Sequence, residues 1–146
     1  MIPILSASLL FVPLALAEAP APMVRALSAY EAPACQDIAA LSPSPVEDLG
    51  WVVDHVSQPP WAPMTAAQCL LQLYPEETRP VAERWVVDPE RAGLARLVFG
   101  ELERLPPEVA LPLARAALAG PHAPILERRL ARSEDPTLRA LVLPAP

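Results

Sequence analysis

The sequence contains no lysine and no asparagine, so all 11 basic side chains are arginine. The absence of lysine excludes chemistry that needs an ε-amino group, such as a Schiff base or the lysine of a P-loop. The absence of asparagine excludes N-linked glycosylation, which requires an Asn-x-Ser/Thr site. Only 4 of the 146 residues are glycine, which argues against phosphate-binding loops and tight β-turns.

Positive charge is also scarce. The 11 arginines face 17 acidic residues, giving a net charge of −6, which argues against nucleic acid as a partner. With 53% hydrophobic residues the chain is too apolar to be disordered, and its length suits one domain. The 21 prolines far exceed the usual share of about 5%, so we expect short, frequently interrupted helices.

Residues 1–17 have the pattern of a secretory signal peptide. They carry no charged side chain and end in Ala15-Leu16-Ala17, a small-x-small cleavage site. The segment is short for a membrane span, which needs about 20 apolar residues, although an uncleaved anchor is the alternative. We expect export to the periplasm or the outside, and no membrane insertion after cleavage before Glu18.

Cys35 and Cys69 are the only cysteines. In an oxidising compartment an even number of cysteines favours a disulfide. A Cys35–Cys69 bridge would stabilise the fold by about 3–4 kcal/mol on the chain-entropy model. The alternative is two buried free thiols that pack as small apolar groups.

Apolar residues follow helical spacing from residue 33 onward, and hairpin dipeptides are absent. The spacing predicts an all-α fold with one helical domain over 33–142, an Ala/Pro-rich, loosely packed arm over 18–32, and a tail over 143–146. Ser44 to Glu47 matches a capping box. The helices are predicted near 34–41, 45–56, 63–74, 78–87, 90–104, 108–119 and 124–132, with a last turn near 137–142. Leu94, Leu97 and Val98 are spaced i, i+3 and i+4, which predicts that they share the buried face of the helix near 90–104.

The chain also matches itself at two shifts. A shift of 32 residues superposes four residues of one segment on identical residues of a later one: Pro75, Pro80, Ala82 and Leu94 on Pro107, Pro112, Ala114 and Leu126. A shift of 34 superposes Trp51 on Trp85, which predicts that both are core residues. Periods of this length indicate stacked helix pairs that cover one another's apolar faces.

Two segments with Asp-Pro turns, Thr78–Arg91 and Ser133–Val142, resemble HEAT repeats. The resemblance covers about residues 44–142, with irregular repeats. It implies a small right-handed α-solenoid of antiparallel helix pairs that binds other proteins. It implies neither catalytic residues nor a cofactor.

Residues able to carry catalysis are few. His55 and His122 have no metal-ligating neighbour at helical spacing, so we interpret Asp54-His55 as a helix end rather than a general-base pair. No nucleophile, zinc or phosphate-loop motif occurs. Carboxylates one or two positions apart do not face each other on a helix, so Glu101 and Glu103 are expected in solvent. We therefore expect no catalytic, cofactor or metal site.

The residues best suited to a partner are Arg128, Arg129, Arg132 and Trp61. Residues 18–74 contain one arginine and six acidic residues, whereas 75–146 contain 10 arginines and 11 acidic residues. This asymmetry can orient a partner or stack copies head to tail. Alternatively, the arginines only complement a helix dipole. Trp61 is predicted in a proline-rich loop, either as an exposed anchor or as a cap on the core.

Together these features predict an exported helical-repeat protein that acts as a protein–protein interaction module or scaffold in the cell envelope. One alternative is an all-α enzyme whose polar groups converge only in three dimensions. Another is a lineage-specific structural protein of the envelope. A cleft that holds a histidine beside a carboxylate would favour the enzyme, and a groove of apolar and arginine side chains would favour the interaction module.

The first prediction concerns the N-terminus. N-terminal sequencing of the protein from its native host is expected to begin at Glu18 or within one or two residues of it, because cleavage follows small residues such as Ala17. Protein that retains Met1 in a cytoplasmic fraction would contradict export.

Overall fold

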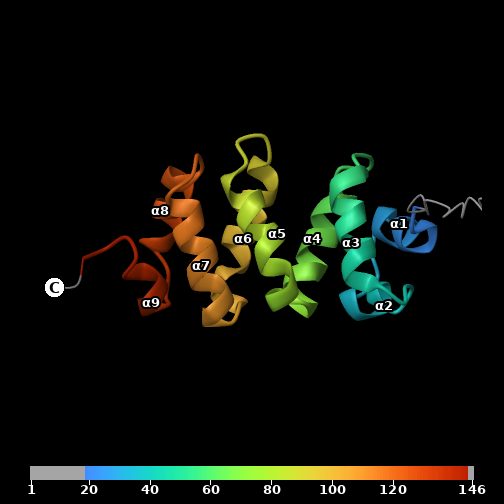
Figure 1. Cartoon of the computed structure of the whole chain (residues 1–146), viewed down its shortest axis with the longest axis horizontal. Helices are drawn as coiled ribbons and strands as arrows, with labels where there is room; N and C mark the ends of the chain where they lie inside the picture. The colour runs from blue at the N-terminus through green and yellow to red at the C-terminus, as the bar shows by residue number, and fades with distance from the viewer. Residues whose placement is uncertain (1–18, 145–146) are drawn as a thin grey trace, which may run out of the picture.

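The computed structural model describes residues 19–144, which form helices and connecting turns without a strand. The all-α prediction is therefore confirmed for these residues. The helices follow one another along the long axis of the molecule, from α1 and α2 at one end to α9 at the other (Figure 1). Their bounds are α1 (Ala21–Ser28), α2 (Cys35–Ala39), α3 (Pro45–His55), α4 (Trp61–Leu73), α5 (Pro75–Val87), α6 (Ala92–Glu101), the 3-10 helix η1 (Leu102–Arg104), α7 (Pro107–Leu118), α8 (Ala123–Leu130) and α9 (Pro136–Arg139).

Consecutive helices pack against each other, and each pair also contacts the next. Helix α3 packs on α4, α5 on α6, and α7 on α8. Across pairs, α5 contacts α7, while α4 contacts α6 and α6 contacts α8. The apolar face of each helix pair is thus covered by its neighbours. Among residues 19–144, no helix is both long enough and apolar enough to cross a membrane.

The residues matched by the 32-residue shift lie at the same helical positions. Pro75 and Pro107 are the first residues of α5 and α7. A backbone N–H at this position has no acceptor within the helix, so proline costs no hydrogen bond there. Pro80 and Pro112 lie inside the same two helices. Leu94 of α6 and Leu126 of α8 are both buried, as are the other matched residues Ala82 and Ala114.

One predicted capping interaction is absent. The side chain of Ser44 makes no capping hydrogen bond to α3. Instead, the Ser42 hydroxyl accepts from the Ser44 N–H at 2.9 Å and donates to Asp48. Asp135, by contrast, caps α9 by accepting from the N–H groups of Thr137 and Leu138. The prediction for Ser44 was wrong because Ser42 and Asp48 form the local network in its place.

The core is continuous along the stack, but its position on α6 differs from the prediction. Leu94 and Val98 are buried as expected, whereas Leu97 is only half-buried. Helix α6 packs against both α4 and α5, which moves its buried face toward Ala95 and Phe99. Leu97 therefore lies at the margin of the core.

The two matched tryptophans also differ in burial. Trp85 is 2% exposed and belongs to the core. Trp51 is half-buried and stacks on His55, with ring centroids 4.6 Å apart. Helix α5, which carries Trp85, contacts α4, α6 and α7, whereas α3 contacts α4 and the short helices α1 and α2. Trp51 thus packs at the margin of the core.

The predicted loose arm is partly wrong. Residues 18–32 contain α1, in which Met23 and Leu27 are almost completely buried and which packs against α4. These two residues lie one helical turn apart and face the same side. Residues 1–17, predicted as a signal peptide, lie outside the residues that the structure describes.

The predicted disulfide is present. It joins Cys35, the first residue of α2, to Cys69, which is completely buried in α4, with the two Cα atoms 5.2 Å apart. Helix α2 has only five residues, too few for a helix that is stable without tertiary contacts. The bridge therefore holds this short helix against the first part of the core.

Two leucine truncations test the position of the core. Leu113 of α7 is 1% exposed, so Leu113→Ala should lower the free energy of unfolding by about 2–5 kcal/mol. Leu97→Ala should cost distinctly less, because part of that side chain already contacts water. Chemical denaturation of both variants measures the difference, and equal losses would contradict the assigned helix face.

Candidate functional site

Three of the four predicted partner residues come together around one concavity. Arg128 and Arg129 of α8 and Arg132 in the following turn line a hollow of about 400 Å³. The remaining lining residues are Glu103, Ile125 and Ser133. We call this concavity the arginine hollow.

The arginines point outward because of the apolar pattern of α8. Leu126 and Leu130, one turn apart, are buried and fix the inner face of the helix. Residues 127–129 are consequently exposed. The guanidinium of Arg129 lies over α6, where a Cβ atom placed on Gly100 would be 3.9 Å from Nη2. The hollow is thus lined by α8, the turn after it and Glu103 of η1, next to the contact between α8 and α6.

A network of hydrogen bonds holds the turn that carries Arg132. The buried Ser133 hydroxyl donates to Glu103 and accepts from the Asp135 N–H, the latter at 3.1 Å. Arg139 donates to the Ser133 carbonyl oxygen at 3.1 Å. The same turn continues into α9, capped by Asp135. These contacts fix the backbone of the turn that carries Arg132.

The arginine hollow carries an excess of positive charge. Among residues 19–144, ion pairs form at Arg79, Arg91 and Arg104, and at none of the three arginines of the hollow. The one carboxylate in the lining, Glu103, accepts a hydrogen bond from Ser133. Guanidinium groups bind carboxylates and phosphates through paired hydrogen bonds. The hollow is therefore suited to a negatively charged group.

A second concavity, of about 320 Å³, contains two arginines, of which Arg91 is paired with carboxylates and Arg84 forms no ion pair with a described residue. Arg91, at the start of α6, donates to Asp54 of α3 at 3.0 Å and lies 3.5 Å from Asp88. Trp85 lines the same concavity, and its buried indole N–H has no hydrogen-bond partner. Because Arg91 joins α3 to the α5–α6 turn, these charges serve contacts between helix pairs.

Neither of the two histidines forms an ion pair with a carboxylate of residues 19–144. The Nδ1 atom of His55 lies 2.9 Å from the Trp51 carbonyl oxygen, while neighbouring Asp54 pairs with Arg91. His122 is buried, and its Nε2 atom lies 2.8 Å from the Asp88 carbonyl oxygen. Each ring nitrogen with an assigned contact therefore faces main chain. Within residues 19–144, no cluster of metal-ligating side chains occurs.

The fourth predicted partner residue, Trp61, does not line the arginine hollow. Its placement in a loop was wrong, because Trp61 is the first residue of α4. Pro63 falls within the first helical turn, where proline costs no intrahelical hydrogen bond. The side chain of Trp61 is 44% exposed.

The interpretation of Glu101 as a solvated carboxylate was also wrong. Its side chain is 6% exposed and accepts from Gln68 and Arg104, each at 3.4 Å. Glu101 ends α6 where that helix packs against α4. Spacing within one helix does not reveal a contact of this kind, since Gln68 lies on another helix.

No family model, curated protein or solved structure matches the chain.

The unpaired arginines lead to a stability prediction. Arg132→Ala is expected to change the free energy of unfolding by less than about 0.5 kcal/mol, the usual range for exposed side chains without special contacts. Loss of a favourable helix-dipole contact and relief of repulsion from Arg128 are each a few tenths of a kcal/mol and oppose each other. Urea denaturation checks this value, and a loss above about 1 kcal/mol would assign Arg132 to the fold.

Proposed function

We propose that this protein is an exported, HEAT-like helical-repeat protein that binds another protein in the cell envelope. The arginine hollow is the proposed contact site. The observation that carries the proposal is the convergence of Arg128, Arg129 and Arg132 on one concavity without an ion pair to any described residue.

The order of the helices supports a repeat protein. Pairs α5–α6 and α7–α8 contain matched residues at matched positions, and successive pairs contact each other along the long axis (Figure 1). Stacked pairs form extended surfaces on which side chains from neighbouring repeats can meet. Glu103, in η1, and Arg132, after α8, meet in this way.

The disulfide and the first 17 residues support export. A buried Cys35–Cys69 bridge is compatible with an oxidising compartment. The uncharged, apolar segment that ends at Ala17 has the composition of a secretory signal. Both features favour the envelope or the outside as the place where the partner is met.

The surroundings of the histidines favour binding over catalysis. Neither His55 nor His122 forms a pair with a carboxylate, and each contacts a main-chain carbonyl. The arginine hollow offers guanidinium groups and a serine hydroxyl that is already hydrogen-bonded. Such a set recognises an anionic group but supplies no evident general base.

Site-specific photo-crosslinking in the native host tests the proposal. A crosslinking amino acid at Arg132 should give a defined adduct with one envelope protein, whereas the same group at exposed Gln58 should not. Introducing Arg128→Glu and Arg129→Glu together should reduce the adduct about tenfold or more, because reversed charges repel an acidic partner.

The matched control for this experiment is Arg115→Glu, an exposed arginine of α7 outside the lining of the hollow. It should leave the adduct unchanged. Identical adducts from positions 132 and 58, or an adduct that persists after the double charge reversal, would contradict a partner at the arginine hollow.

A further inference from the structure

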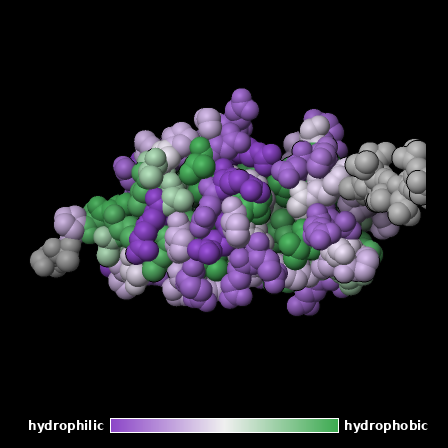
Figure 2. Space-filling view, in the orientation of Figure 1, coloured by the Kyte–Doolittle hydropathy of each residue, from purple (hydrophilic) through white to green (hydrophobic). Residues whose placement is uncertain are grey.

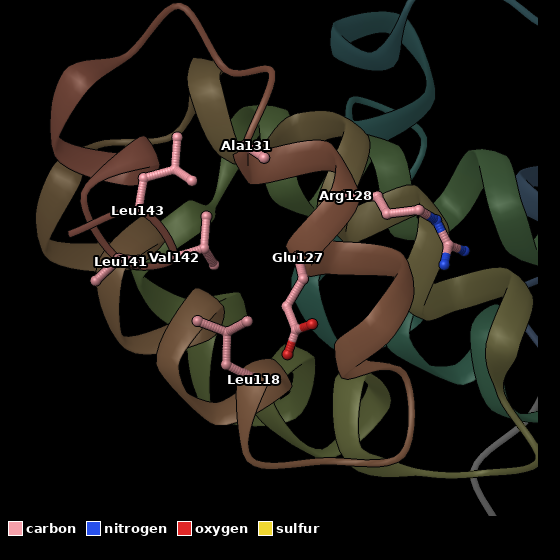
Figure 3. Close-up of a pocket in the computed structure, with 7 residues that line it drawn as sticks. All are labelled: Leu118, Glu127, Arg128, Ala131, Leu141, Val142 and Leu143. Carbon is pink, nitrogen blue, oxygen red and sulfur yellow. The ribbon is translucent and has the colours of Figure 1, made fainter.

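The end of the stack formed by α7, α8 and α9 carries an open apolar groove of about 530 Å³ (Figure 3). We call it the terminal groove. Its apolar lining includes Leu118 of α7 and also Leu141, Val142 and Leu143, which follow α9. Leu143 is 44% exposed, and no later helix of residues 19–144 covers this end. Figure 2 shows hydrophobic surface at the same end. Terminal repeats of soluble repeat proteins normally present polar outer faces, so the terminal groove is suited to an occupant.

Two charged residues of α8 give the terminal groove its polar character. Figure 3 shows the Glu127 carboxylate directed toward Leu118, while the Arg128 guanidinium points away from the three apolar residues after α9. The groove thus offers a hydrogen-bond acceptor within it and a cation at its edge. A tyrosine followed by an acidic residue matches these features: its ring suits the apolar lining, its hydroxyl can donate to the Glu127 carboxylate, and the acidic side chain can pair with Arg128.

The opposite end of the molecule carries such a group. Tyr30, in the turn between α1 and α2, is 93% exposed and is the most exposed large hydrophobic residue in the described chain. Its neighbours in residues 29–34 are exposed as well. Glu31 follows it directly. Tyrosine at the centre of an interface contributes a large apolar area and a hydroxyl donor.

Charge favours contact between unlike ends. Residues 19–74 contain one arginine against five acidic residues, whereas the α8 end presents three arginines without ion pairs. Two α8 ends would place arginines opposite arginines, which costs binding energy. A flat anionic membrane suits the terminal groove less well, because the groove is recessed and contains the Glu127 carboxylate.

We propose that copies of this protein associate end to end, with Tyr30 of one copy seated in the terminal groove of the next. In this contact the ring packs against Leu118 and the residues after α9. The Tyr30 hydroxyl donates to the Glu127 carboxylate, and Glu31 pairs with Arg128. Because α1–α2 and α8–α9 lie at opposite ends of the long axis (Figure 1), the contact joins unlike surfaces and adds further copies head to tail instead of stopping at a dimer. The two proposed contacts share Arg128, which lines both concavities, whereas Tyr30 and Leu143 belong to the end-to-end contact alone.

Sedimentation of the purified protein alone, from micromolar to submillimolar concentration, tests the inference. The average mass should rise with concentration and pass that of a dimer without a plateau. Tyr30→Ser should weaken association about tenfold or more, as expected for a central interface residue. The matched control is Val87→Ser, which alters another exposed apolar side chain, 41% exposed, away from both ends.

Mixing two variants tests the polarity of the contact. Tyr30→Ser keeps an intact terminal groove, and Leu143→Asp keeps an intact Tyr30. Each should remain largely monomeric alone, whereas an equal mixture should form dimers and nothing larger. In addition, Glu31→Arg and Arg128→Glu should each weaken association, and the double variant should regain part of it because the pair is reversed.

Three results would overturn the inference. One is a wild-type protein that remains monomeric at every concentration. Another is a closed dimer that Tyr30→Ser does not affect. The third is a mixture of Tyr30→Ser and Leu143→Asp that forms no dimer although circular dichroism shows both variants to be folded. None of these results bears on the crosslinking expected at Arg132.

Discussion

Packing of each helix pair against the next is the interaction on which the rest of this structure depends. The longest helices, α4 and α5, have 13 residues, a length at which isolated helices are marginal in water. Both α5 and α7 also contain an internal proline, which removes a backbone hydrogen bond. Their stability must therefore come from buried side chains such as Trp85 and Leu113, which only neighbouring pairs can cover.

The same constraint explains the composition of the chain. Prolines begin α3, α5, α7 and α9, so a residue that breaks helices elsewhere here sets where each one starts. Glycine is scarce, and no residue in the described chain has a positive φ angle. The turns are instead formed by Asp-Pro and similar pairs, as at Asp135, whose carboxylate caps α9.

Much of this fold was predictable because its signals are local. The matched Pro75 and Pro107 occupy the same position in two helices, although the first of these helices was predicted to begin near residue 78 and begins at Pro75. The cysteine pair correctly indicated the bridge. Helix α1 was not predicted because it has few apolar side chains. The burial of Met23 and Leu27 depends on packing against α4, which the local sequence does not reveal. The half-burial of Leu97 likewise depends on how α6 divides its surface between α4 and α5.

The candidate site likewise combines residues that are close in sequence with contacts that only the folded chain creates. Arg128, Arg129 and Arg132 are close in sequence, so their grouping follows from the chain itself. Glu103 and Ser133 are 30 residues apart and meet only through the folded stack. No local pattern identifies that contact, although it fixes the turn on which Arg132 stands.

The position of the disulfide gives the two ends of the molecule different resistance to opening. Cys35–Cys69 ties the α2 end covalently to α4, whereas the α8 end is closed by a four-residue helix held by one aspartate cap and a few side chains. Segments with few buried contacts open at a lower free energy than the core of a protein. We therefore expect α9 to open before the disulfide-linked end, and a ligand that binds only the folded form of this end to stabilise the folded protein.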